Sequence, residues 1–426
     1  MLFGKNQRHV AFGLLFVLGG GLLLPSGAIA AKIKPVAGQK QLIDGIYTES
    51  FEAGSAFQQA MDFYQRKEYK QAQKYIEQAL VFDPWMPMGH YLQGQLYIVT
   101  KKPRKAQESY RLATLYDPNF TAAYYNLGLV SYELGDLRDA IAALNKAVML
   151  EPEFVDAHFQ LGLAYDVQGD AAQAQTAYVT VLNLDDSYVA AYNNLGITLA
   201  EQNKTEEAIA NFEQAIAIDP NYSPAYYQLG LLYLKQNELE LALDTVGQAA
   251  KTGPDNALAQ YHYGLLLAET GNHNAAADRF EKTVKLDPNN VSAYRQLGVA
   301  ELTRGELDDA LVAFQAAINL DPEDAYSHYN LGVVYQKLAQ YDRAIAAYQQ
   351  ALIYDPRLSE AVFNIGVSYH AMGNSRQATT FLVQARELFA QEGRDFKVQE
   401  TDRFLRLNVL PQANPTPAAQ SAPEQI

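Results

Sequence analysis

One period of 34 residues runs through most of this 426-residue chain and limits its fold more than any other feature. A glycine recurs at that spacing, at Gly94, Gly128, Gly162, Gly196, Gly230, Gly264, Gly298, Gly332 and Gly366, and Ala60 occupies the same position upstream. An alanine follows each of these residues twelve positions later, from Ala72 to Ala378. Self-similarity at such a period is typical of repeat architectures. The sequence therefore predicts ten structural repeats.

Each repeat has the pattern of two helices joined by a tight turn. In the third repeat, apolar residues follow the 3.6-residue helical period up to Leu134, and Gly135 can then adopt positive φ. A second periodic stretch ends at Glu151-Pro152, because proline disfavours helix in the residue before it. The equivalent turns hold residues that tolerate the left-handed conformation, namely Gly169, Asn203, Asn237, Gly271, Gly305 and Gly373.

Small residues set the distance between the two helices. Gly128 and Ala140 have almost no side chain, so we expect them to face each other. With their neighbours they resemble the tetratricopeptide repeat family, whose signature positions here are Tyr124, Leu127, Gly128, Ala140, Leu144, Ala147 and Pro152. The resemblance implies an all-α, right-handed superhelical solenoid of ten 34-residue helix-turn-helix repeats with a C-terminal capping helix.

The repeat spacing divides the chain into segments. The ten repeats are expected at 53–86, 87–120, 121–154, 155–188, 189–222, 223–256, 257–290, 291–324, 325–358 and 359–392. A linker (31–52) precedes them, and Trp85, the only tryptophan, is interpreted as a filler of the turn between the first two repeats. A capping helix (393–410) is expected to pack through Phe396, Phe404 and Leu407, followed by a disordered, proline-rich tail (411–426).

Residues 1–30 predict a secretory signal peptide. Lys5 and Arg8 precede an apolar run from Val10 to Leu24, and small residues lead to a cleavage position after Ala30. The apolar run is shorter than the roughly 18 residues of a typical spanning helix. We expect export to the periplasm or another extracytoplasmic lumen, with an uncleaved N-terminal membrane anchor as the alternative.

Composition and motifs exclude several classes of function. The net charge of −15 argues against nucleic acid and anionic membrane surfaces as ligands, although the N-terminal segment leaves peripheral membrane association open. There is no cysteine, and no phosphate-binding, nucleophile-elbow, zinc-protease or calcium-loop motif occurs. His90, His158 and His328 share one repeat position and are expected to replace core aromatic residues. We expect no catalytic, cofactor or metal site, no small-molecule substrate, and no enzyme activity.

The first helix of each repeat is expected to line the inner face, where the resemblance implies binding. Two residues before the glycines lies a row of neutral hydrogen-bonding residues, the polar row: Asn126, Gln160, Asn194, Gln228, His262, Gln296, Asn330 and Asn364. One residue earlier lies the aromatic row: Tyr125, Phe159, Tyr227, Tyr261, Tyr329 and Phe363. The two rows resemble the asparagine-lined groove in the repeat region of O-linked N-acetylglucosamine transferases, which holds extended peptides by their backbone. Because the family favours the same residue types for packing, a purely structural role stays open.

These features predict a non-enzymatic protein–protein interaction scaffold in the cell envelope. It would bind an extended polypeptide or a partner surface in the groove and assist the assembly of a complex. The alternative is a periplasmic subunit of a secretion, pilus or polysaccharide-export machine, where similar repeats occur.

Overall fold

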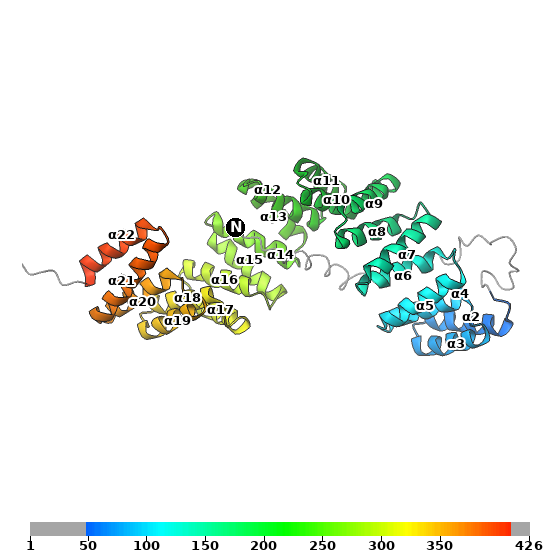
Figure 1. Ribbon diagram of the computed structural model, residues 1–426, viewed down its shortest axis with the longest axis horizontal. Coiled ribbons are helices and arrows are strands. Elements are labelled where there is room, and N and C mark those ends of the chain that lie inside the picture. The colour runs from blue at the N-terminus through cyan, green and yellow to red at the C-terminus, as the bar shows by residue number, and fades with distance from the viewer. Residues whose placement is uncertain (1–47, 410–426) are drawn as a thin grey trace, which may run out of the picture. The chain divides into compact units, whose positions relative to one another are not determined.

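The computed structural model describes residues 48–409, and this part of the chain is helical throughout, with 21 α-helices and no strand (Figure 1). The predicted signal peptide and the proline-rich tail lie outside the described residues. None of the helices within residues 48–409 is long and apolar enough to cross a bilayer. The described residues separate into two compact parts, residues 48–191 and 192–409, which are described in turn.

The N-terminal part contains four consecutive helix pairs. Their bounds are α2 (Phe51–Gln65) with α3 (Tyr69–Phe82), α4 (Pro87–Val99) with α5 (Pro103–Tyr116), α6 (Thr121–Glu133) with α7 (Leu137–Leu150), and α8 (Val155–Gln168) with α9 (Ala171–Leu184). Each helix begins about 34 residues after its counterpart in the preceding pair.

The C-terminal part continues the same arrangement, beginning within α10. The pairs are α10 (Val189–Glu201) with α11 (Thr205–Ile218), α12 (Ser223–Lys235) with α13 (Leu239–Thr252), α14 (Ala257–Glu269) with α15 (His273–Leu286), α16 (Val291–Arg304) with α17 (Leu307–Leu320), α18 (Ala325–Lys337) with α19 (Tyr341–Tyr354), and α20 (Ser359–Ala371) with α21 (Ser375–Gln391). A last helix, α22 (Asp395–Phe404), continues into a short π-helix, η2 (Leu405–Val409). The predicted all-α stack of helix-turn-helix repeats is confirmed.

The turns inside the helix pairs have the left-handed backbone that the sequence predicts. Gly135 has φ of 77° and Asn203 has φ of 61°, and the other glycines and asparagines named above are also positive. Sequence analysis missed Lys67, Lys101 and Ala339, which have φ of 62°, 57° and 57° at equivalent turns. The repeat therefore imposes the left-handed conformation even on residues for which it costs free energy.

The recurring glycine makes room for a large side chain on the second helix. A Cβ on Gly162 would lie 2.5 Å from Cε1 of Tyr178, and one on Gly128 would lie 2.6 Å from Cγ of Leu144. The nearest atom of Ala140 is its backbone oxygen, which would lie farther from that Cβ, at 3.4 Å. Glycine is therefore needed because of the large residue sixteen positions later, and not because of the small alanine.

Contacts between repeats distinguish the two helices of each pair. In both parts of the chain, the second helix of a repeat packs on the first helix of the following repeat, as α3 packs on α4 and α15 packs on α16. First helices also contact the next first helices, as α6 contacts α8 and α16 contacts α18. Within residues 48–409, second helices make no comparable contact with one another. The first helices therefore form the more closely packed face of each stack.

Two predictions about apolar residues are wrong. Trp85 does not fill its turn, because it is 68% exposed and the adjacent Met86 is fully buried instead. In the capping helix, Phe396 and Leu407 are 77% and 60% exposed. Phe404 packs as predicted, against Phe363 and His370 of α20. The other packed residues are Thr401, Leu405 and Val409, and the last two belong to the π-helix, which changes the register that the α-helical period had suggested.

The glycine contact generates the first prediction. Gly162→Ala should lower the free energy of unfolding by about 1–3 kcal/mol, because the new methyl group overlaps the fully buried Tyr178 ring. The opposite change, Ala339→Gly, should stabilise the protein by about 1 kcal/mol, because it relieves a left-handed alanine in an exposed turn. Thermal melts followed by circular dichroism compare the two variants. An unchanged melting temperature for Gly162→Ala would contradict the packing argument.

Candidate functional site

The polar row lies in the middle of successive first helices. Asn126 is on α6 and Gln160 is on α8 in the N-terminal part, and the other six residues lie on α10, α12, α14, α16, α18 and α20. The aromatic row directly precedes it on the same helices. Each part of the chain thus carries its own segment of the two rows.

Three members of the polar row bond to a tyrosine of the preceding repeat. Asn126 donates from Nδ2 to Oη of Tyr91 at 3.0 Å, and Asn364 donates in the same way to Tyr329 at 3.3 Å. The hydroxyl of Tyr227 lies 2.8 Å from Nδ1 of His262. In each pair the two residues are 35 positions apart. These side chains connect neighbouring first helices.

The environment of these pairs is partly desolvated. Burial raises the pKa of Tyr91 to about 12, and its hydrogen bonds with Gln95 and Asn126 oppose that rise only in part. Burial lowers the pKa of His262, against the effect of a hydrogen bond with the Leu258 carbonyl. The His262 ring is therefore neutral near pH 7, buried, and already engaged by Tyr227 and Leu258. Both contacts are to Nδ1, so Nε2 is the ring nitrogen that could still meet a ligand.

Asn194 is also enclosed. It is buried beside Asn193, which takes the place of an aromatic residue and donates from Nδ2 to Oδ1 of Asn194 at 3.1 Å. The backbone carbonyl of Asn194 accepts a hydrogen bond from Thr198. A ligand would have to displace these contacts to reach the side chain.

The other four members of the polar row remain available. Gln160, Gln228, Gln296 and Asn330 are half-buried, and their side-chain amides make no hydrogen bond within the described residues. Gln296 and Asn330 come from consecutive first helices, α16 and α18, which contact each other. Beside them, Arg295 and Asp324 form an ion pair at 2.7 Å where other repeats have an aromatic residue. Gln296 and Asn330 are therefore a pair of unoccupied amides on one face.

The aromatic row points into the hairpins. The ring of Tyr125 lies 4.8 Å from that of Phe154, and the ring of Tyr329 lies 5.7 Å from that of Tyr348. Phe159 similarly packs on Tyr178 and Tyr188. Such aromatic pairs stabilise the fold. The structural interpretation that the sequence left open fits these residues better than ligand contact does.

The histidines that share a repeat position have a linking role. Nε2 of His90, His158 and His328 lies 2.8–3.0 Å from the carbonyl of the proline that closes the preceding repeat. Gln260 occupies the same position and donates to two carbonyls of the preceding repeat. Among the described residues, no group of three or more histidines and acidic residues is arranged to hold a metal ion.

Comparison with protein families decides what kind of repeat this is. Models described as tetratricopeptide repeat match residues 89–120, 227–290 and 325–358, and a model described as TPR repeat matches 129–169, 198–237 and 300–338. The chain is a tetratricopeptide repeat protein. Tetratricopeptide repeat proteins are protein–protein interaction scaffolds, so the general prediction of a scaffold that binds proteins or peptides is confirmed.

Several solved structures resemble parts of this tetratricopeptide repeat protein. They include YrrB, described as having an unusual peptide-binding site (26% identity over 44% of this chain and 97% of that one, TM-score 0.42). MamA from Desulfovibrio magneticus RS-1 (25%, 40% and 96%, 0.38) and PilF from Pseudomonas aeruginosa (19%, 51% and 98%, 0.41) are others. With TM-scores below 0.5, these likenesses add nothing to the family assignment. No curated protein sequence gives a significant match.

Sequence analysis missed an aliphatic row on the first helices. From Gly128 on, the residue after each recurring glycine is aliphatic, and all are half-buried except the buried Leu163: Leu129, Leu163, Ile197, Leu231, Leu265, Val299, Val333 and Val367. Residues three positions apart share a helix face, so this row lies next to the polar row. The 34-residue spacing would have revealed it, but an aliphatic residue in a helix is usually assigned to the core.

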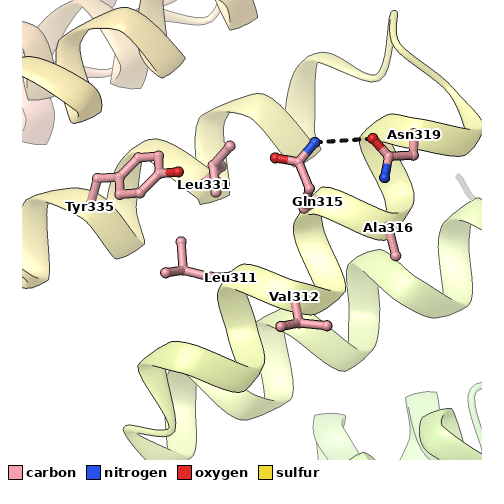
Figure 2. A pocket seen from close by; sticks show the side chains of 7 residues that line it. All are labelled: Leu311, Val312, Gln315, Ala316, Asn319, Leu331 and Tyr335. Carbon is pink, nitrogen blue, oxygen red and sulfur yellow. Dashed lines mark hydrogen bonds between the residues drawn. The ribbon is translucent and has the colours of Figure 1, made fainter.

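A second candidate site lies on the outer side of the C-terminal part. Leu311, Val312, Gln315, Ala316 and Asn319 of α17, with Leu331 and Tyr335 of α18, line a depression of about 470 Å³. Figure 2 shows Gln315 and Asn319 turned toward each other on one side of it, and Nε2 of Gln315 donates to Oδ1 of Asn319 at 3.1 Å. No described charged side chain lines this depression. It offers fewer free polar groups than the Gln296 and Asn330 pair.

The tyrosine links in this tetratricopeptide stack generate the second prediction. A double-mutant cycle with Tyr91→Phe and Asn126→Ala should give a coupling energy of about 0.5–1.5 kcal/mol, because the two side chains share a partly desolvated hydrogen bond. Tyr125→Phe with Gln160→Ala is the matched control one repeat later. No hydrogen bond joins that pair in the described structure, so its coupling should be near zero. Urea unfolding of the four single and two double variants measures both values, and equal couplings would refute the assignment.

Proposed function

We propose that this tetratricopeptide repeat protein is an exported scaffold of the cell envelope that holds extended polypeptide segments along its first helices. Its role would be to assist the assembly of an envelope complex. The observation that carries the proposal is the pair Gln296 and Asn330, which are half-buried, unpaired within the described residues, and on adjacent first helices.

A carboxamide suits the backbone of an extended chain. Each carboxamide offers a donor and an acceptor, so it can pair with a peptide N–H and C=O whatever side chains the partner carries. The neighbouring aliphatic residues Val299 and Val333 would add apolar contact on the same helices. Broad specificity follows, because neither type of contact depends strongly on the sequence of the bound segment.

The third prediction concerns this pair of amides. Gln296→Ala with Asn330→Ala should weaken binding of short synthetic peptides by about 5- to 150-fold, since two hydrogen bonds contribute about 1–3 kcal/mol together. Peptides with N-methylated backbones should bind the unaltered protein more weakly than their unmodified counterparts. Isothermal titration calorimetry measures both effects.

The chain offers a matched control for this experiment. Gln315→Ala with Asn319→Ala removes the same two residue types from the outer depression, where they bond to each other (Figure 2). That variant should keep full peptide affinity. If the outer pair weakens binding and the Gln296 and Asn330 pair does not, the binding face is the outer one and the proposal fails.

The fourth prediction concerns location. The basic start, the apolar run and the small residues before Ala31 support export with removal of the leader. N-terminal sequencing of the protein from its native host should therefore begin at Ala31. A chain that still begins at Met1 and sediments with membranes would favour the anchored alternative.

A further inference from the structure

The first three repeats share an exposed apolar residue near the end of the second helix. Val81 on α3, Leu115 on α5 and Met149 on α7 are spaced 34 residues apart and are 78%, 65% and 64% exposed. All three lie in the N-terminal part of the chain. Side chains this exposed add little to the core of the repeats.

The other repeats show that the fold does not need an apolar residue there. The five repeats that follow have Asn183, Ala217, Lys251, Lys285 and Asn319 at the same position, in helices of the same length. Ile353 in the ninth repeat is apolar and 64% exposed, but no neighbouring repeat shares its character. The apolar residues of the first three repeats therefore require an explanation other than folding.

A basic residue accompanies each of the three. Lys70, Arg104 and Arg138 stand eleven positions earlier on the same helices, and all are exposed. Eleven residues make three helical turns, so each basic residue lies on the same face as its apolar partner. Arg104 pairs with Asp136 at 3.0 Å, whereas Lys70 and Arg138 have no acidic partner in the described part of the chain. The corresponding residues of the next five repeats are Ala172, Glu206, Glu240, Asn274 and Asp308.

We call these six residues the outer stripe: Val81, Leu115, Met149, Lys70, Arg104 and Arg138. Its first repeat adds two exposed aromatic residues, Phe82 and Trp85, and a further exposed base, Lys74. The local charge also differs from that of the whole protein. Residues 53–154 contain eleven Lys and Arg against eleven Asp and Glu, whereas residues 155–324 contain eight against twenty-five.

We propose that the outer stripe rests on an anionic phospholipid surface. Helices that bind the headgroup region of a membrane carry apolar side chains beside lysine and arginine. Tryptophan is also enriched in that region. The apolar residues stand on second helices that do not pack on one another, so they form separate points and not the continuous patch that a protein partner would cover. Each apolar side chain can insert separately among the lipid headgroups.

Chain continuity supports a membrane as the occupant. The chain enters the first repeat at Thr48 from a segment whose sequence contains the apolar run 10–24 and the basic residues Lys32, Lys34 and Lys40. The membrane contact thus rests on the proposed export, in which the leader would bring the first repeat to a bilayer. Contact through second helices would leave the first-helix face open to a polypeptide.

The experiment uses the chain from Ala31 on, which retains every described residue and lacks the apolar leader. Flotation with phosphatidylcholine vesicles that contain phosphatidylglycerol should recover the protein, and pure phosphatidylcholine vesicles should not. Val81→Ser, Leu115→Ser and Met149→Ser together should reduce vesicle affinity at least about tenfold. Lys70→Glu with Arg138→Glu should do the same, and raised salt should weaken the unaltered protein.

Ile353→Ser is the matched control, because it makes the same change at the same repeat position and at similar exposure in the ninth repeat. It should leave vesicle binding unchanged. Circular dichroism melts verify that all variants remain folded. Equal recovery of the triple variant and the unaltered protein overturns the proposal. So does a loss of self-association, measured by sedimentation, without any vesicle binding, because that result assigns the stripe to a second copy of the chain.

Discussion

The contact between a glycine on the first helix and a large side chain on the second determines how nine of the ten repeats are built, and Ala60 takes the glycine position in the first repeat. Where a Cβ would lie 2.4–2.7 Å from that side chain, the two helices are already as close as they can be, and only glycine fits. This contact recurs from Gly94 to Gly366. The large partner on the second helix varies among tyrosine, phenylalanine, leucine and valine. The contact therefore fixes the distance between the two helix backbones but not the identity of the side chain that lies against the glycine.

Because the hairpin is stabilised internally, the links between repeats can vary. Some repeats use a tyrosine and an amide, as Tyr91 and Asn126 do, and in one Arg295 of α16 pairs with Asp324, the N-cap residue of α18. Others connect a histidine to a proline carbonyl, as His158 does with Pro152. In a linear stack each link involves only two neighbours, so changing one need not disturb the rest. Some residues of the polar row therefore form hydrogen bonds between repeats, whereas others make none within the described residues.

This mixture explains what the sequence could and could not predict. The hairpins, their turns and their 34-residue spacing follow from helical periodicity and from residues such as Gly135 and Pro152, which act locally. The role of a polar-row residue depends on a partner 35 positions away. Asn126 and Asn330 look alike in sequence, yet Asn126 faces a tyrosine hydroxyl and Asn330 follows a repeat with Arg295 at that position. Leu407 was misplaced for a different reason, since it lies in the π-helix that begins at Leu405 and changes the register there.

Comparing equivalent positions of the repeats separates residues that the fold requires from residues with a local function. Each repeat position is sampled up to ten times on nearly the same backbone, so the repeats serve as controls for one another. A residue type that appears at nearly every repeat reports the fold, as the glycine does. An apolar residue in three consecutive repeats, as at Val81, Leu115 and Met149, cannot be required by a backbone that accepts Lys251 or Asn319 at the same position. Exposed side chains that depart from the repeat pattern together are thus explained by something outside the stack, and Val81, Leu115 and Met149 satisfy that criterion.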